Sequence, residues 1–280
     1  MIEETLSYLI LGVVQGLTEF LPVSSSGHLT LFSEFLGIKS DDITFKVLVH
    51  FATALSTIIV FRKDIVGLTL GFSQKTEEGY KARKYILLLA LSAIPAALVG
   101  FTLKDTIEAL DNTQFVGYML IVTAFILIAS QKLNSHLEKK LGVSNSILIG
   151  IAQAFAILPG ISRSGSTIGA ALLLGISRAE AAKFSFLMAL PVILGATLLE
   201  TKDLLEVGVV NSGPIFGYVV GVVSAFLSGL LACKLMITLV KNTNLMWFAV
   251  YCGIMGLLAS CQEFQDLIKF LLERYLTHLQ

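Results

Sequence analysis

Two short polar segments interrupt apolar stretches of the chain, and they carry the residue types that phosphate chemistry requires. The first reads QGLTEFLPVSSSGH over residues 15–28, and the second reads PGISRSGST over residues 159–167. Gln15 and Glu19 are four residues apart, so they share one face of a helix about a turn before the first break. A carboxylate inside an apolar segment is costly unless it meets a partner or water. Glu19 is therefore either a functional residue or a structural one that is hydrogen-bonded inside the bundle.

The serine run of the first segment predicts an anion site. The residues that open the next apolar helix are small and polar: Ser24, Ser25, Ser26 and Gly27. Their hydroxyls and the free backbone N–H groups of a helix N-terminus point together, an arrangement that binds phosphate. His28 follows directly, and a histidine beside a buried carboxylate can act as a nucleophile or transfer a proton. The residues leave open whether His28 or Ser25 is the nucleophile, and we favour His28. The alternative interpretation of His28 is that it is a packing residue without a role in the chemistry.

Arg163 lies in the second polar segment, within an otherwise apolar stretch. A guanidinium presents a fork of donors that matches a phosphate, and in an apolar environment it needs an anion to offset its desolvation. We therefore predict that Arg163 clamps a phosphate. The alternative is a structural salt bridge between Arg163 and Glu19.

The composition places these segments in a membrane protein. The chain has 280 residues, of which 55% are hydrophobic and 14% charged, and its mean hydropathy is +0.82. Its formal net charge is zero, so nothing indicates a nucleic-acid partner. Two regions, 6–37 and 144–176, contain the polar breaks and are predicted as re-entrant helix pairs facing an internal cavity. The other long apolar segments are predicted to span the membrane: 45–62, 85–103, 113–131, 181–199, 214–240 and 245–263.

The two broken regions resemble each other. At a constant offset of 138 residues the same residue types recur, in the pairs Gly12 and Gly150, Gln15 and Gln153, Ser24 and Ser162, Ser26 and Ser164, and Gly27 and Gly165. We predict one membrane domain, 1–280, built from two repeats, 1–140 and 141–280. Each repeat has one re-entrant pair and three spanning helices, and this odd number inverts the second repeat. Placing the Lys- and Arg-rich loop 62–84 in the cytoplasm puts both termini outside.

Some polar residues outside the two breaks are assigned to packing. His50 lies one turn inside a predicted spanning helix, and Leu187 is its counterpart when the helix start at Lys46 is matched with that at Lys183, so we interpret His50 as a packing residue. Cys233, Cys252 and Cys261 lack metal-ligand spacing and lie in apolar segments. They are predicted to be small packing residues.

The two motifs closely resemble the signatures of the undecaprenyl-diphosphate phosphatases of the bacitracin-resistance type. QGLTEFLPVSSSGH corresponds to (E/Q)xxxE followed by PVSSxGH, and PGISRSGST corresponds to PGxSRSGxT. The resemblance implies hydrolysis of undecaprenyl diphosphate to the monophosphate carrier for cell-wall synthesis. It implies dependence on a divalent cation, Mg²⁺ or Ca²⁺, with Glu19 and Gln15 as metal residues. Many members carry Glu where this chain has Gln15, which puts any mechanism with two carboxylates there in doubt.

The site residues that follow fall into two groups. The predicted catalytic set is Glu19, Ser25, His28 and Arg163, and the predicted substrate-binding set is Ser24, Ser26, Gly27, Ser162, Ser164, Gly165 and Thr167. The expected location is the cell inner membrane, with the site opening to the outer, periplasmic face. A homodimer is possible.

An inverted repeat with broken helices is also a transporter architecture, so a lipid flippase or secondary transporter is the alternative. The combination of Glu, His, Arg and Ser at the breaks is more than passive binding needs, which favours the hydrolase. A structural scaffold would leave Glu19 and Arg163 without a purpose. Release of phosphate by purified protein would separate these classes.

Overall fold

The computed structural model describes residues 2–38, 42–132, 139–207, 214–242 and 244–261, and in these ranges the regular elements are all helices. The first half contributes α1 (Ile2–Phe20), α2 (Ser25–Phe35), α3 (Ile43–Val60), α4 (Arg62–Phe72), α5 (Glu77–Thr102), α6 (Lys104–Glu108) and α7 (Thr113–Lys132). The second half contributes α8 (Val143–Phe155), α9 (Arg163–Leu173), α10 (Arg178–Val207), α11 (Ile215–Asn242) and α12 (Met246–Ser260).

Within the described ranges, five helices are long and apolar enough to cross a membrane: α3, α5, α7, α10 and α11. The prediction of an all-helical polytopic membrane protein is confirmed. Two details differ from the sequence prediction. The sixth predicted span, 245–263, corresponds to α12, which has only 15 residues. Residues 262 and 263 of that predicted span lie outside the described ranges. The predicted loop 62–84 contains the helix α4, whose outward apolar side chains include Leu70 and Phe72.

Both broken regions form a helix, a short irregular link and a second helix. The link 21–24 separates α1 from α2, and the link 156–162 separates α8 from α9. Ser24 and Ser162 are the N-caps of the second helices, and each side chain accepts a hydrogen bond from the backbone N–H three residues on. These capping residues are 138 positions apart, so the recurring serines have the same structural role in both regions.

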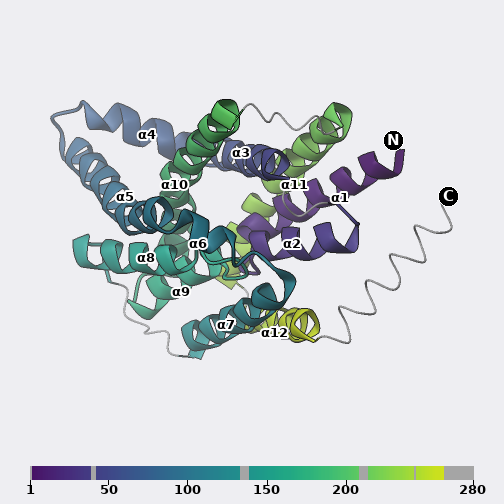
Figure 1. Ribbon diagram of the computed structural model, residues 1–280. Coiled ribbons are helices and arrows are strands. Elements are labelled where there is room, and N and C mark those ends of the chain that lie inside the picture. Colours follow the sequence, from purple (N-terminus) through teal and green to yellow (C-terminus); the bar gives the residue numbers. More distant parts are fainter. Residues whose placement is uncertain (1, 39–41, 133–138, 208–213, 243, 262–280) are drawn as a thin grey trace, which may run out of the picture.

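The packing partners of the helices also correspond between the halves. Helix α1 packs against α11, and α8 packs against α5, while α7 packs against α12 and α3 against α10 (Figure 1). A Cβ atom on Gly12 would lie 2.1 Å from the Ser224 Oγ of α11, and one on Gly150 would lie 2.5 Å from the Ser92 carbonyl oxygen of α5. Both glycines therefore permit a close helix contact. Helix packing does not orient the halves in a membrane, so the inverted topology and the repeat boundaries stay predictions.

The main apolar core lies where α9, α10 and α11 meet, and its largest buried side chains include Phe184, Phe186 and Met188. Large apolar side chains also cover much of the outer surface, such as Leu98, Phe101 and Phe216, each at least 60% exposed. A surface of this kind is suited to lipid contact. In the polar breaks, Ser24, Ser162 and Ser164 are buried. Among the cysteines, Cys233 and Cys252 are buried as predicted, whereas Cys261 is exposed.

Candidate active site

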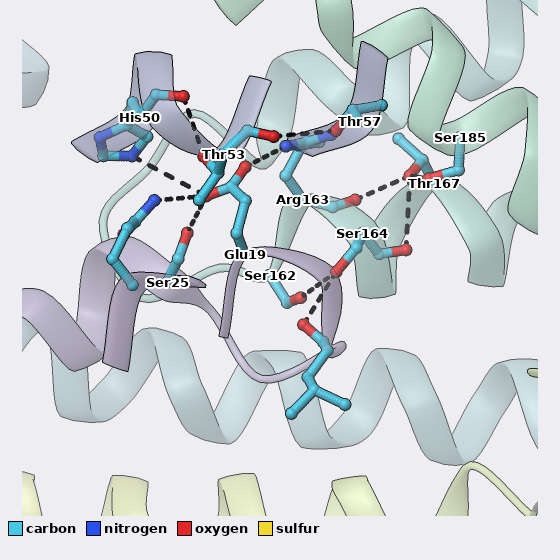
Figure 2. Close-up of polar contacts among 12 residues, drawn as sticks. Glu19, Ser25, His50, Thr53, Thr57, Ser162, Arg163, Ser164, Thr167 and Ser185 are labelled. Carbon is cyan, nitrogen blue, oxygen red and sulfur yellow. Dashed lines mark hydrogen bonds and ion pairs between the residues drawn. The ribbon is translucent and has the colours of Figure 1, made fainter. Parts of the chain in front are cut away.

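Glu19 joins the two polar breaks. It lies at the end of α1, is 7% exposed, and contacts side chains from three other places in the chain. Its Oε2 accepts hydrogen bonds from Gln15 Nε2 at 2.8 Å and from Ser25 Oγ at 2.7 Å. Its Oε1 forms a salt bridge with the Nη2 of Arg163. Figure 2 shows Glu19 between Ser25, His50 and the Arg163 guanidinium. The predicted catalytic residues Glu19, Ser25 and Arg163 are therefore in direct contact.

The local sequence explains this arrangement in the first half. Gln15 and Glu19 lie one above the other on α1 because they are four residues apart. Pro22 follows shortly after α1 ends, and Ser24 has a φ of 73°, in the left-handed region that few non-glycine residues adopt. This turn brings Ser25, the first residue of α2, back to the carboxylate.

The second break is held by Thr123 of α7 and by the first break. Thr123 Oγ1 donates to the Gly160 carbonyl oxygen at 3.1 Å and accepts from the Ser162 backbone N–H at 3.0 Å. Gly160 has a φ of 90°, which favours glycine at this position. Ser164 Oγ donates to the Leu21 carbonyl oxygen at 3.0 Å, so the two breaks are hydrogen-bonded to each other. Arg163, the first residue of α9, is thereby directed at Glu19 (Figure 2).

The salt bridge that the sequence left as an alternative for Arg163 is present. The side chain of Arg163 is 19% exposed and that of Glu19 is 5% exposed, so the guanidinium is the more accessible partner. A guanidinium has five N–H donors, and a single contact with a carboxylate oxygen leaves others for a phosphate. The phosphate-clamp role stays a prediction that is compatible with this salt bridge.

The predicted substrate-binding residues differ in how accessible they are. Ser25, Ser26 and Arg163 are partly exposed. The others are buried, and their side-chain hydroxyls or backbone N–H groups form hydrogen bonds at the two helix starts: Ser24, Gly27, Ser162, Ser164, Gly165 and Thr167. Thr167 Oγ1, for example, bonds the Arg163 carbonyl oxygen at 2.8 Å and the Ser185 hydroxyl at 2.5 Å. In this geometry the buried group acts by shaping the helix N-termini.

His28 is positioned differently from the other predicted catalytic residues. It is 1% exposed and lies against α12, where its ring stacks on Tyr251 with centroids 5.5 Å apart. Its Nδ1 is 2.8 Å from the Ser24 carbonyl oxygen, and its Nε2 is 2.6 Å from the Tyr251 hydroxyl. A carbonyl oxygen can only accept, so Nδ1 carries the hydrogen and Nε2 accepts from Tyr251. Both ring nitrogens are thus bonded to groups other than Glu19 and Arg163. No local pattern in the sequence indicated Tyr251, which is 223 residues away from His28.

His50 corrects the packing assignment made from the sequence. Its Nε2 lies 4.0 Å from Glu19 Oε2, and its side chain is 31% exposed. On α3 it lies on one helix face with Thr53 and Thr57 (Figure 2), because these positions recur at helical spacing. The mirrored Leu187 was a poor guide to its role. One feature of the sequence could have indicated a functional role for His50: it is an ionisable side chain inside an apolar spanning helix, and such residues usually have a function.

The comparisons with known proteins agree with the two motifs. The family model described as bacitracin resistance protein BacA matches residues 8–258. An undecaprenyl-diphosphatase of Christiangramia forsetii is 45% identical over 90% of this chain and 95% of its own length. An undecaprenyl-diphosphatase of Bacteroides thetaiotaomicron is 42% identical over 90% of this chain and 96% of its own length. One of Methanococcus vannielii is 41% identical over 89% of this chain and 96% of its own length.

The chain belongs to the bacitracin resistance protein BacA family. The part of the chain that matches the BacA family includes both breaks, His50 and Tyr251. All the contacts described at Glu19 therefore lie within the family region.

A divalent cation fits part of the Glu19 environment. Gln15 is fully buried, and its Oε1 has no hydrogen-bond partner. Because a carboxylate oxygen accepts and does not donate, the amide nitrogen must face Glu19, which leaves Oε1 available as a ligand. Across the described ranges, no three His, Cys, Asp or Glu side chains form a cluster that could hold a metal. Glu19 and Gln15 of this BacA-family chain would therefore hold a cation that takes further ligands from water and phosphate oxygens, as Mg²⁺ does.

The contact between Glu19 and Arg163 predicts strong energetic coupling between the two halves. Glu19→Gln or Arg163→Met alone leaves a charged group without its partner, which costs about 3–5 kcal/mol for a buried pair. The double variant removes both charges, so its destabilisation will be smaller than the sum by about 1–3 kcal/mol. The measurement is a double-mutant cycle on unfolding in mixed micelles.

The control is the exposed pair Glu77 and Lys81, which are 2.8 Å apart with side chains 82% and 70% exposed. Its coupling is expected to be no more than about 0.5 kcal/mol. Additive effects for Glu19→Gln and Arg163→Met would contradict the importance of the salt bridge.

Proposed function

We propose that this BacA-family chain is an undecaprenyl-diphosphatase that hydrolyses undecaprenyl diphosphate to undecaprenyl phosphate and inorganic phosphate. Besides the names of the chain's relatives, one structural observation supports the proposal: Arg163 of the second break and Ser25 of the first both contact the carboxylate of Glu19. One site thus contains the Arg163 guanidinium, which can bind phosphate oxygens, the Ser25 hydroxyl, and the Glu19 carboxylate, which can accept the proton of that hydroxyl. Phosphoryl transfer needs mainly positioning and charge stabilisation, which these groups supply.

Ser25 is the proposed nucleophile. Its hydroxyl already donates to Glu19 Oε2 at 2.7 Å, so the proton has an acceptor when Oγ attacks the terminal phosphorus. The bond from Oγ to phosphorus forms as the bond to the bridging oxygen breaks, and undecaprenyl phosphate leaves. Water then hydrolyses the phosphoserine and releases inorganic phosphate, and the Ser25 hydroxyl regains a proton from Glu19. Arg163 and the N-terminus of α2 stabilise the phosphate oxygens throughout.

This assignment replaces the preference for His28 that the sequence suggested. Both His28 nitrogens are bonded, to Ser24 and to Tyr251, so the ring is placed to hold the start of α2. His28 is therefore proposed as a positioning residue of the catalytic set. A divalent cation, when bound, would neutralise charge on the phosphate oxygens, and Glu19 and Gln15 are the residues proposed to hold it.

The substrate's prenyl chain is proposed to leave the site sideways into lipid, along the apolar outer surface. The proposed location is the cell inner membrane, with the site open to the outer, periplasmic side, because the Lys- and Arg-rich loop 62–84 is expected inside. A homodimer stays a prediction. The transporter alternative is not favoured, since relatives over about nine-tenths of the chain are named as hydrolases.

Hydrolysis depends on Arg163 and Ser25. Purified protein will release phosphate from undecaprenyl diphosphate, and Arg163→Ala or Ser25→Ala will lower kcat at least about 100-fold, the usual scale for losing a charge-stabilising or nucleophilic group. Arg62→Ala is the matched control, because Arg62 is exposed and its side chain donates to the Ile59 carbonyl oxygen near the end of α3, away from the breaks; it should keep normal turnover. Near-normal turnover of either site variant would refute the assignment.

The proposed orientation predicts which side of the membrane reaches Ser26. In a background with Cys233, Cys252 and Cys261 replaced by Ser, Ser26→Cys in intact spheroplasts should react with a membrane-impermeant thiol reagent. Ser73→Cys, in the exposed link after α4, should react only after the membrane is opened. The reverse pattern would mean that the site faces the cytoplasm.

A further inference from the structure

His50 is the side chain at the Glu19 site that the proposed mechanism does not use. It enters from α3 and approaches Glu19 Oε2 (Figure 2), the same oxygen to which Gln15 and Ser25 donate hydrogen bonds. We propose that His50 is a third protein ligand of the divalent cation, beside Glu19 and Gln15. This inference deepens the proposed function and rests on it.

The hydrogen bond on the far side of the ring fixes which nitrogen is available. His50 Nδ1 is 2.7 Å from the Lys46 backbone carbonyl oxygen, which can only accept, so Nδ1 carries a hydrogen. In a neutral ring Nε2 then has no hydrogen, and its lone pair is available on the side of the ring near Glu19. Metal-binding histidines very often have this arrangement, with one ring N–H donated to a backbone carbonyl and the other nitrogen on the metal.

The distance between Nε2 and Oε2 also suits a shared ion. At 4.0 Å it is too long for a hydrogen bond. Two ligands that each lie about 2.0–2.2 Å from one cation are between about 2.9 and 4.2 Å apart, depending on the angle at the metal. Two acceptors facing each other are unfavourable unless something positive lies between them. A cation between Nε2 and Oε2 satisfies both.

Gln15 supplies an independent observation. Its Oε1 is a fully buried acceptor without a hydrogen-bond partner, on the amide whose nitrogen bonds the same Glu19 oxygen. An unpaired buried carbonyl oxygen costs about 1–3 kcal/mol, and a cation ligand role removes that cost. The Gln15 amide and the His50 imidazole thus both lie next to Glu19 Oε2.

The charges around this position are compatible with a cation. Arg163 bonds the other carboxylate oxygen, Oε1, so Glu19 can bridge the guanidinium and the ion. Lys46, one turn before His50, has its ammonium 2.8 Å from Asp111 and is thereby paired away from Glu19. The nitrogen ligand predicts a preference for Mn²⁺ over Ca²⁺, since Ca²⁺ takes oxygen ligands.

The test is the electron spin-echo spectrum of Mn²⁺ bound to the full-length protein in detergent. We expect a nitrogen coupling that changes when histidine is labelled with ¹⁵N, and that disappears in His50→Gln and His50→Ala. Mn²⁺ affinity should fall about tenfold or more in both variants. His28→Gln serves as the spectral control, because both of its ring nitrogens are already bonded, and it should keep the coupling.

Bound Mn²⁺ without a histidine nitrogen coupling in the unmutated protein would overturn the inference and favour His50 as a charged partner of Glu19. Retention of the coupling in His50→Gln, or no Mn²⁺ binding at all, would also overturn it. Phosphate release is measured on the same samples. Turnover without nitrogen coupling refutes the role of His50 alone, whereas no turnover by the unmutated protein refutes the proposed function.

Discussion

The arrangement of the site depends on compensating one buried carboxylate. Glu19 lies among apolar helices with 7% of its surface exposed, where an unpaired charge would cost several kcal/mol. No single element offers enough partners. Gln15 comes from the same helix, Ser25 from the start of the next, and Arg163 from the other half of the chain. The charge on Glu19 therefore links the two halves and directs the groups with phosphate chemistry to one point.

A second constraint determines how the breaks can exist within apolar surroundings. Irregular backbone inside a membrane must find hydrogen-bond partners within the protein. Thr123 provides them at the second break, bonding Gly160 and Ser162, and the Cys252 thiol lies 3.7 Å from the Pro22 carbonyl oxygen at the first. Gly160 and Pro22 are 138 residues apart, and each break is contacted by a helix of the other half: α7 of the first half at Gly160, and α12 of the second half at Pro22. The helix starts that result are the proposed phosphate-binding elements.

The sequence predicted most of what depends on local pattern. The breaks, their serine caps and the five long spans follow from residue type and spacing. What it missed depends on contacts between distant segments. The pairing of His28 with Tyr251 crosses almost the whole chain, and the closeness of His50 to Glu19 requires α3 to pack beside the first break. The duplication also misled the interpretation, because it assigned His50 the role of an apolar counterpart.

The diphosphate is proposed to bind where Arg163 and Ser25 meet at Glu19. The decisive measurement is a structure of the full-length protein with farnesyl methylenediphosphonate, which cannot be hydrolysed at the bridging position. We expect phosphonate oxygens about 3 Å from both the Arg163 guanidinium and the Ser25 hydroxyl, with the prenyl chain directed towards the lipid-facing surface. A headgroup bound away from both breaks, with Arg163 and Glu19 in contact only with each other, would contradict it.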